Sequence, residues 1–189
     1  KGKDLNIPGR KEASKNIHIG IDFLASVAFE HVSKIGKKVI VLGGGNTAMD
    51  CCRTAVRLGG ENVGVYVRSP KVDMKASNWE IEEAEIENIP IFENHVPKEF
   101  LIKDGKLRGM LFEKVTAHYE NNKRKLIPTG EPLVEVECDD VLMAIGQDNA
   151  FDWIEKDIGI KFGEWDMPDV DKTTMQSTLP KVFFGGDAA

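Results

Sequence analysis

The chain has 189 residues, of which 41% are hydrophobic and 30% charged, and this composition is typical of one or two globular domains. Its net charge of −6 argues against a nucleic-acid-binding protein, because a phosphate backbone requires a basic face. No apolar run approaches the roughly 18 residues that span a bilayer, no signal peptide opens the chain, and the three cysteines lack metal-ligand or disulfide spacing, so a reduced cytoplasmic setting is expected.

Helix and strand patterns alternate in the first half of the chain. Residues 1–16 are polar and are expected to form a loop, and apolar positions at three- and four-residue steps predict an amphipathic helix over 16–35. A strand–helix–strand–helix–strand order then follows, with elements expected at 39–42, 46–58, 63–67, 78–88 and 90–93. This order predicts an α/β fold of the Rossmann-like type, with a parallel sheet and right-handed crossovers.

The pattern changes after residue 96. Short strand-like pieces at 97–138 predict an antiparallel β-meander laid onto the parallel sheet, and 141–145 returns as a buried strand. A short helix is expected at 151–156 and a last strand at 182–184. Both ends of the sequence look cut, so the chain is expected to be a fragment of a longer protein.

A glycine-rich turn joins the strand at 39–42 to the following helix. It has the form G-x-G-x-x-A and consists of Gly43, Gly44, Gly45, Asn46, Thr47 and Ala48. The first glycine permits the tight turn, the second lets a pyrophosphate approach the backbone, and the small last residue lets helix and strand pack closely. Unpaired N–H groups at the helix start favour phosphate binding. We expect a dinucleotide site here; the alternative is a crossover turn that binds nothing.

The end of the second strand indicates which nucleotide binds. NAD and FAD sites usually place Asp or Glu there to accept a hydrogen bond from the ribose 2′-hydroxyl. This chain has Arg68 instead, followed by Ser69 and Lys71. A guanidinium offers a fork of donors to a 2′-phosphate, so NADP(H) is the predicted cofactor and Arg68 and Ser69 its predicted contacts. The alternative is a solvated surface arginine.

No catalytic or metal-ligating residue is expected in this chain. Cys51 and Cys52 are adjacent on a helix, with side chains about 100° apart, so packing is favoured over a redox pair. The four histidines are scattered, and the glutamates of 78–88 are expected to form a solvated helix face. Trp79 and Trp153 are expected to be packing residues.

Several of these motifs together resemble the small (beta) subunit family of NADPH-dependent glutamate synthase, which are flavoproteins related to the pyridine nucleotide–disulfide oxidoreductases. The resemblance covers most of the chain. The segments that carry it are 43–59 (the turn and helix), Val65-Tyr-Val-Arg-Ser69, Met74-Lys75-Ala76, 140–147, 171–178 and Lys181-Val-Phe-Phe-Gly-Gly-Asp187. In the second of these segments the family often has two arginines, whereas this chain has one.

The resemblance implies one of the two dinucleotide-binding domains of a flavoprotein, inserted within the other. Residues 1–36 would be a flank from the FAD domain with a linker helix, 37–146 the NAD(P)H-binding domain, and 147–189 part of the FAD-binding domain. Gly186 and Asp187 would meet FAD. Ala144, Ile145 and Gly146 are expected near the nicotinamide, because ligands collect at the carboxyl ends of parallel strands.

For the longer parent protein, the resemblance implies hydride transfer from NADPH to FAD and electron transfer through iron–sulfur clusters to a large electron-accepting subunit or domain. The chain has no iron–sulfur cysteines, and by itself it is expected to be inactive. No nucleic acid or membrane partner is expected. Two other functions remain open: a non-catalytic NAD(P)-binding module, and a stand-alone NAD(P)-dependent dehydrogenase, for which we find no substrate domain.

Overall fold

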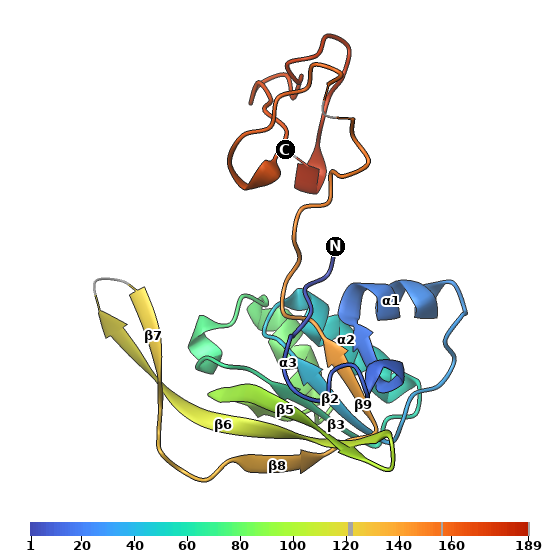
Figure 1. The fold of residues 1–189 in the computed structure, drawn as a ribbon, viewed down its shortest axis with the longest axis vertical. Helices are drawn as coiled ribbons and strands as arrows, with labels where there is room; N and C mark the ends of the chain where they lie inside the picture. The colour runs from blue at the N-terminus through green and yellow to red at the C-terminus, as the bar shows by residue number, and fades with distance from the viewer. Residues whose placement is uncertain (121–122, 156, 189) are drawn as a thin grey trace. The chain divides into compact units, whose positions relative to one another are not determined.

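The computed structural model describes residues 1–120, 123–155 and 157–188, and of Lys123 and Asp187 only the backbone. The chain divides into two compact units, one of residues 2–146 and the other of residues 147–189 with Lys1 (Figure 1). Each unit is described by itself.

A five-stranded parallel sheet is the centre of the first unit. In spatial order its strands are β1 (Ile17–Ile19), β9 (Asp140–Met143), β2 (Lys38–Leu42), β3 (Asn62–Tyr66) and β4 (Ile91–Phe92). All four neighbouring pairs are parallel, and Val41 lies opposite Val65 on one side and Leu142 on the other. The predicted α/β fold with a parallel sheet is confirmed.

Three helices cover one face of this sheet: α1 (Gly20–Ala28), α2 (Asn46–Arg57) and α3 (Asn78–Ile86). Side chains alternate between the two faces along β2, so Val39 and Val41 pack against the helices. Ile40 and Leu42 belong to a separate core on the opposite face. A strand that is buried on both faces must be apolar throughout, which explains the continuous run in the sequence.

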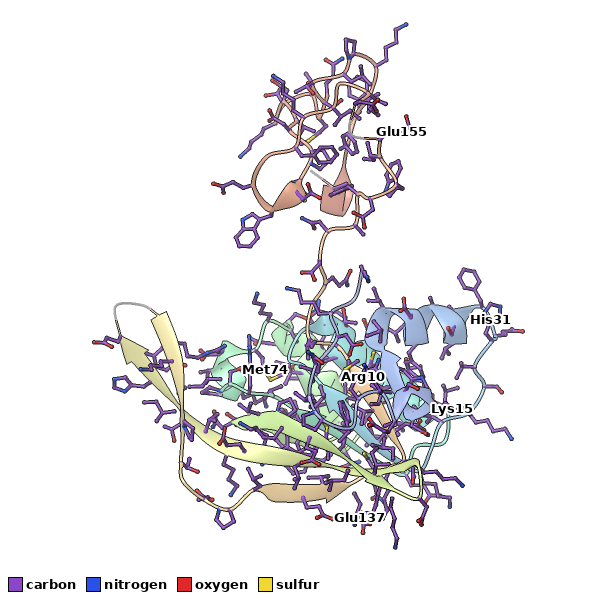
Figure 2. The ribbon with its side chains drawn as sticks, in the orientation of Figure 1. Arg10, Lys15, His31, Met74, Glu137 and Glu155 are labelled. Atoms are coloured by element: carbon purple, nitrogen blue, oxygen red, sulfur yellow. The ribbon has the colours of Figure 1, made fainter. Side chains whose placement is uncertain are left out.

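An antiparallel sheet covers the second face (Figures 1 and 2). Its strands are β5 (His95–Lys103), β6 (Lys106–Glu120), β7 (Lys123–Pro128) and β8 (Val134–Glu137). The long strand β6 pairs with β5 and β8 along its first half and with β7 along its second half. Tyr66 of the parallel sheet stacks on Phe112 with ring centroids 4.6 Å apart, so the two sheets share one core. The predicted meander is confirmed.

The predicted helix over 16–35 is wrong at both ends. Residues Ile17–Ile19 form β1, because they pair with β9, and Ile17 is buried on the antiparallel-sheet side. The helix ends at Ala28, after which Glu30 has a φ of +60°. Val32 and Ile35 still pack against the helix-side core from irregular backbone. The apolar periodicity therefore reported burial correctly, but tertiary pairing decided the secondary structure.

The second unit has little regular structure. The helix expected at 151–156 is absent from the described residues 151–155, and Lys156 lies outside them. At 182–184 there is one isolated bridge, between Phe183 and Gln176, instead of a strand. Trp153 is 75% exposed, and Trp79 of the first unit is 58% exposed, so the prediction that both are packing residues is wrong.

The α3 glutamates are not uniformly solvated. Glu80 is 7% exposed, and its carboxylate lies 3.6 Å from the guanidinium of Arg53, which also pairs with Glu83 and Glu87. The glutamates therefore attach α3 to α2 through Arg53, and the prediction of a solvated face is wrong for this side of the helix. Among the described residues, no helix is both long and apolar enough to cross a membrane.

A buried carboxylate ties the amino ends of the parallel strands together. Asp140, at the start of β9, lies 3.1 Å from Nε2 of His18 and accepts hydrogen bonds from the Asn16 amide (3.2 Å) and the Gly36 N–H (2.7 Å). Burial alone would raise its pKa, but these hydrogen bonds outweigh burial and hold the pKa of Asp140 below the ordinary value of 3.8.

We predict that Asp140→Asn lowers the free energy of unfolding at neutral pH by about 1–3 kcal/mol, because a charged acceptor is lost. A lowered carboxyl pKa stabilises the fold above the unfolded-state pKa, and this contribution disappears as the pH falls below 3.8. Urea titrations at pH 7 and near pH 3 should show the difference between wild type and variant shrinking at the lower pH. Asp104→Asn, in an exposed turn, is the control; an equal loss there would contradict the prediction.

Candidate nucleotide-binding site

The carboxyl ends of three neighbouring parallel strands meet at one edge of the sheet. Leu42 at the end of β2 lies opposite Tyr66 of β3 and Met143 of β9. The backbone just beyond is joined as well: the Gly43 N–H donates to Tyr66 O (3.2 Å) and the Ala144 N–H to Leu42 O (2.8 Å). The predicted glycine turn, the segment after β3 and the segment after β9 therefore lie side by side.

The three glycines of the turn have different environments. Gly43 has a φ of +131°, and a Cβ there would lie 2.1 Å from the Ala144 carbonyl oxygen, so only glycine fits. A Cβ on Gly44 would press on Met74 and Val67, at 3.1 and 3.2 Å. Apart from its chain neighbours, no residue that the structure describes lies within 4 Å of the position of a Cβ on Gly45. The first two positions are thus closed by packing, and the third is open.

The start of α2 presents unpaired backbone donors next to this open position. Among the described residues, none accepts a hydrogen bond from the backbone N–H of Gly44, Gly45, Asn46 or Thr47. The next N–H groups, of Ala48 and Met49, donate to Gly45 O. Ala48 is fully buried, as the close packing of helix on strand requires. Donors in this position, at the positive end of a helix dipole, suit an anion.

The loop after β3 borders the turn. Arg68 is exposed and forms no ion pair with any residue that the structure describes, whereas Ser69 is buried. Lys71, also noted in the sequence, is not available in the same way, because its ammonium lies 2.5 Å from the Glu85 carboxylate. Of the polar side chains in this stretch, Arg68 is therefore the one presented to solvent for a ligand.

The site includes a segment that the sequence pattern alone did not single out. The N–H groups of Lys75 and Ala76 donate to Gly44 O at 2.8 and 3.0 Å, and the Ser77 N–H donates to Asn46 Oδ1 at 2.9 Å. Figure 2 shows Met74 of this segment well apart from Glu137, which pairs with Lys38 at the start of β2. In the sequence, only the family resemblance at Met74-Lys75-Ala76 pointed to this segment.

The segment after β9 completes the edge. Ala144 and Ile145 are half-buried, and Gly146 is exposed with a φ of +114°. A Cβ on Gly20, at the start of α1, would lie 3.1 Å from Met143 O and 3.3 Å from the Ala144 methyl group. The first turn of α1 therefore packs against this segment and leaves room for backbone only.

The two remaining predicted contacts belong to the second unit. Gly186 begins a 3-10 turn, Gly186–Ala188, and no described residue other than the chain neighbours lies within 4 Å of a Cβ built on Gly185 or Gly186. The side chain of Asp187 lies outside the described part of the chain.

Cys51 and Cys52 are packing residues, as the sequence predicts, and Cys138 is buried as well. Cys51, Cys52 and Cys138 are buried free thiols, and burial raises the pKa of each to about 12. They are therefore protonated at neutral pH and are poor nucleophiles. In the described residues, no three His, Cys, Asp or Glu side chains are grouped so that they could hold a metal ion.

Comparison with known proteins identifies the family. All 189 residues match the family model described as pyridine nucleotide-disulphide oxidoreductase. The NADPH-Fe(3+) oxidoreductase subunit beta of Geobacter sulfurreducens is 31% identical over 87% of this chain, and the NADP(+)-dependent formate dehydrogenase subunit beta of Moorella thermoacetica is 31% identical over 97%. The chain spans only about a quarter of the length of these relatives, 25% and 26%.

Solved structures agree on the fold. The thioredoxin reductase of T. acidophilum superposes with a TM-score of 0.75 at 21% identity, covering 100% of this chain and 54% of that protein. FprA from Mycobacterium tuberculosis in complex with NADPH gives a TM-score of 0.66 at 16% identity, covering 89% and 52%. The family match and the two relatives confirm the superfamily that the resemblance to the glutamate synthase small subunit predicts: the chain belongs to the pyridine nucleotide-disulphide oxidoreductase family.

Proposed function

We propose that residues 37–146 bind NADPH and present it for hydride transfer within an FAD-dependent oxidoreductase resembling the glutamate synthase small subunit. Residues 147–189 would belong to its FAD-binding domain and residues 1–36 to the flank and linker. The observation that carries the proposal is the combination of an open Gly45, four unpaired N–H groups at the start of α2 and an exposed Arg68 on one edge of the sheet.

The donors and the open backbone fit a dinucleotide. The N–H groups of Gly44, Gly45, Asn46 and Thr47 would hold the pyrophosphate, which needs the space that a side chain at Gly45 would fill. Ala144, Ile145 and Gly146 would border the nicotinamide end. Bound NADPH supplies a hydride, so this chain's part in the reaction is to orient and hold the cofactor rather than to move protons.

Arg68 would select NADPH over NADH by pairing with the 2′-phosphate, with Ser69 supporting the backbone beside it. Its exposure and lack of an ion partner leave its five N–H donors available. The names of the two relatives, both subunits beta of NADPH- or NADP(+)-dependent oxidoreductases, support this choice.

The longer enzyme would pass electrons from FAD to iron–sulfur centres of a partner subunit or domain. The open Gly185-Gly186 backbone fits the approach of a flavin nucleotide. Both relatives are named as subunits of larger oxidoreductases, which supports an electron-accepting partner. Diaphorase assays with and without added FAD, on this chain and on the longer protein, separate this function from that of a binding module or stand-alone dehydrogenase.

We predict that Gly45→Ala weakens NADPH and NADH binding at least about tenfold without lowering the melting temperature, since its φ of −106° is ordinary and the Cβ meets no protein atom. Gly43→Ala should instead destabilise the fold by about 2 kcal/mol or more, because its Cβ meets Ala144 O at 2.1 Å. Calorimetric titration and thermal melts measure both effects. Gly163→Ala, an equally open glycine in the second unit, is the control; unchanged binding by Gly45→Ala would contradict the pyrophosphate site.

We predict that the chain binds NADPH about tenfold more tightly than NADH, and that Arg68→Ala removes this preference by weakening NADPH binding alone, since one exposed charged hydrogen bond contributes about 1.5 kcal/mol. Raising the salt concentration should reduce the preference. Titration calorimetry of both nucleotides is the measurement. Arg108→Ala, which removes an arginine from the antiparallel sheet, is the matched control. Equal affinities in the wild type would show that the cofactor assignment is wrong.

A further inference from the structure

The hairpin formed by β6 and β7 reaches the loop that carries Arg68. Tyr119 and Arg124 lie opposite each other on its two strands. The Tyr119 hydroxyl donates a hydrogen bond to Asp73 Oδ2, and the Arg124 guanidinium lies 3.0 Å from the same oxygen. Asp73 ends the 3-10 turn Lys71–Asp73, so two side chains that are 46 and 51 residues distant in sequence converge on one carboxylate. In Figure 1 the hairpin projects beyond the rest of its sheet, beside this turn.

Asp73 is one of several points at which this loop is fixed. Immediately after it, Lys75 and Ala76 donate to Gly44 O in the glycine turn. Just before it, the Lys71 N–H donates to the Glu93 carboxylate at 2.6 Å. The loop from 68 to 76 thus connects the hairpin to the glycine turn. We expect a displacement of Asp73 to move both Arg68 and the Lys75–Ala76 backbone that binds Gly44 O.

The contact of Asp73 with Tyr119 and Arg124 also affects the charge of the loop. The hydrogen bond from Tyr119, and then that from Arg124, hold the pKa of Asp73 below its usual value, so the carboxylate is charged at neutral pH. The side chains of Asp73 and Arg124 are only 24% and 28% exposed, so water screens their charges less than at an open surface. Without Arg124, an unbalanced negative charge would stand in the same loop as Arg68, where it would repel a phosphate and attract the guanidinium.

We propose that Tyr119 and Arg124 act as positioning residues for cofactor selection: they neutralise Asp73 and hold the 68–76 loop so that Arg68 stays available for the 2′-phosphate of NADPH. This inference rests on the proposed function, because it assigns a role at the same nucleotide site. The β6–β7 hairpin would thus contribute to the preference for NADPH over NADH at the site on the parallel sheet.

A purely structural role for the contact has a different signature. If Tyr119 and Arg124 only stabilise the fold, their loss lowers the melting temperature and changes the affinities for NADPH and NADH together. If they control the charge beside Arg68, their loss weakens NADPH selectively, and neutralising Asp73 as well restores it. The ratio of the two affinities therefore separates the roles, even when a variant is less stable.

The experiment is a titration of NADPH and NADH into the 189-residue chain carrying Arg124→Gln, Asp73→Asn, or both, at low and high salt. Arg124→Gln should weaken NADPH binding about fivefold at low salt, leave NADH binding unchanged, and show a smaller effect at high salt. Adding Asp73→Asn to Arg124→Gln should recover most of the loss, because the repelling charge is removed. Tyr119→Phe, which keeps Arg124, should give a smaller loss in the same direction.

The controls separate failure of this inference from failure of the proposed function. Arg108→Gln removes an arginine from the same strand β6, where it pairs with Glu135, and should leave both affinities unchanged. Equal effects of Arg124→Gln on NADPH and NADH, no effect on either, or no recovery with Asp73→Asn would each overturn the role of the hairpin. A wild-type chain without NADPH preference would instead overturn the NADPH assignment on which it rests.

Discussion

The parallel pairing of β2 between β3 and β9 is the constraint on which the rest of the first unit depends. It buries β2 on both faces, with Val41 toward the helices and Leu42 toward the antiparallel sheet. It also brings the backbone beyond the strands so close together that a Cβ on Gly43 would meet Ala144 O. Strands in this register end at the same edge, so the turn, the Arg68 loop and the segment after β9 become neighbours.

The two edges of the sheet have opposite chemistry. At the amino edge, hydrogen bonds from His18, Asn16 and Gly36 satisfy the buried Asp140 carboxylate, which ties the strands together. At the carboxyl edge, the N–H groups from Gly44 to Thr47 have no acceptor within the described part of the chain. Unsatisfied donors are costly when buried and tolerable when a ligand or water reaches them. This asymmetry is the physical reason that a stabilising contact is expected at one edge and a binding site at the other.

The antiparallel sheet does more than cover the second face. Its Phe112 stacks on Tyr66, while Tyr119 and Arg124 of its hairpin hold Asp73 in the loop after β3. Loops at the carboxyl edge of a parallel sheet carry function but have few contacts of their own. Contacts from a separate sheet hold Asp73 of this loop, and we propose that the availability of Arg68 depends on them.

The sequence by itself determined the parallel sheet, the glycine turn and the family, because continuous apolar runs, the G-x-G-x-x-A spacing and the residues that follow each strand are local features of the chain. Only the tertiary structure decided that Ile17–Ile19 is a strand, since those residues are extended through pairing with β9, which lies about 120 residues away. The tertiary structure alone also revealed that Lys75 and Ala76 donate hydrogen bonds to Gly44 O and that Tyr119 and Arg124 bind Asp73. Contacts between distant segments leave no periodicity in the sequence, because each partner satisfies only its own local pattern.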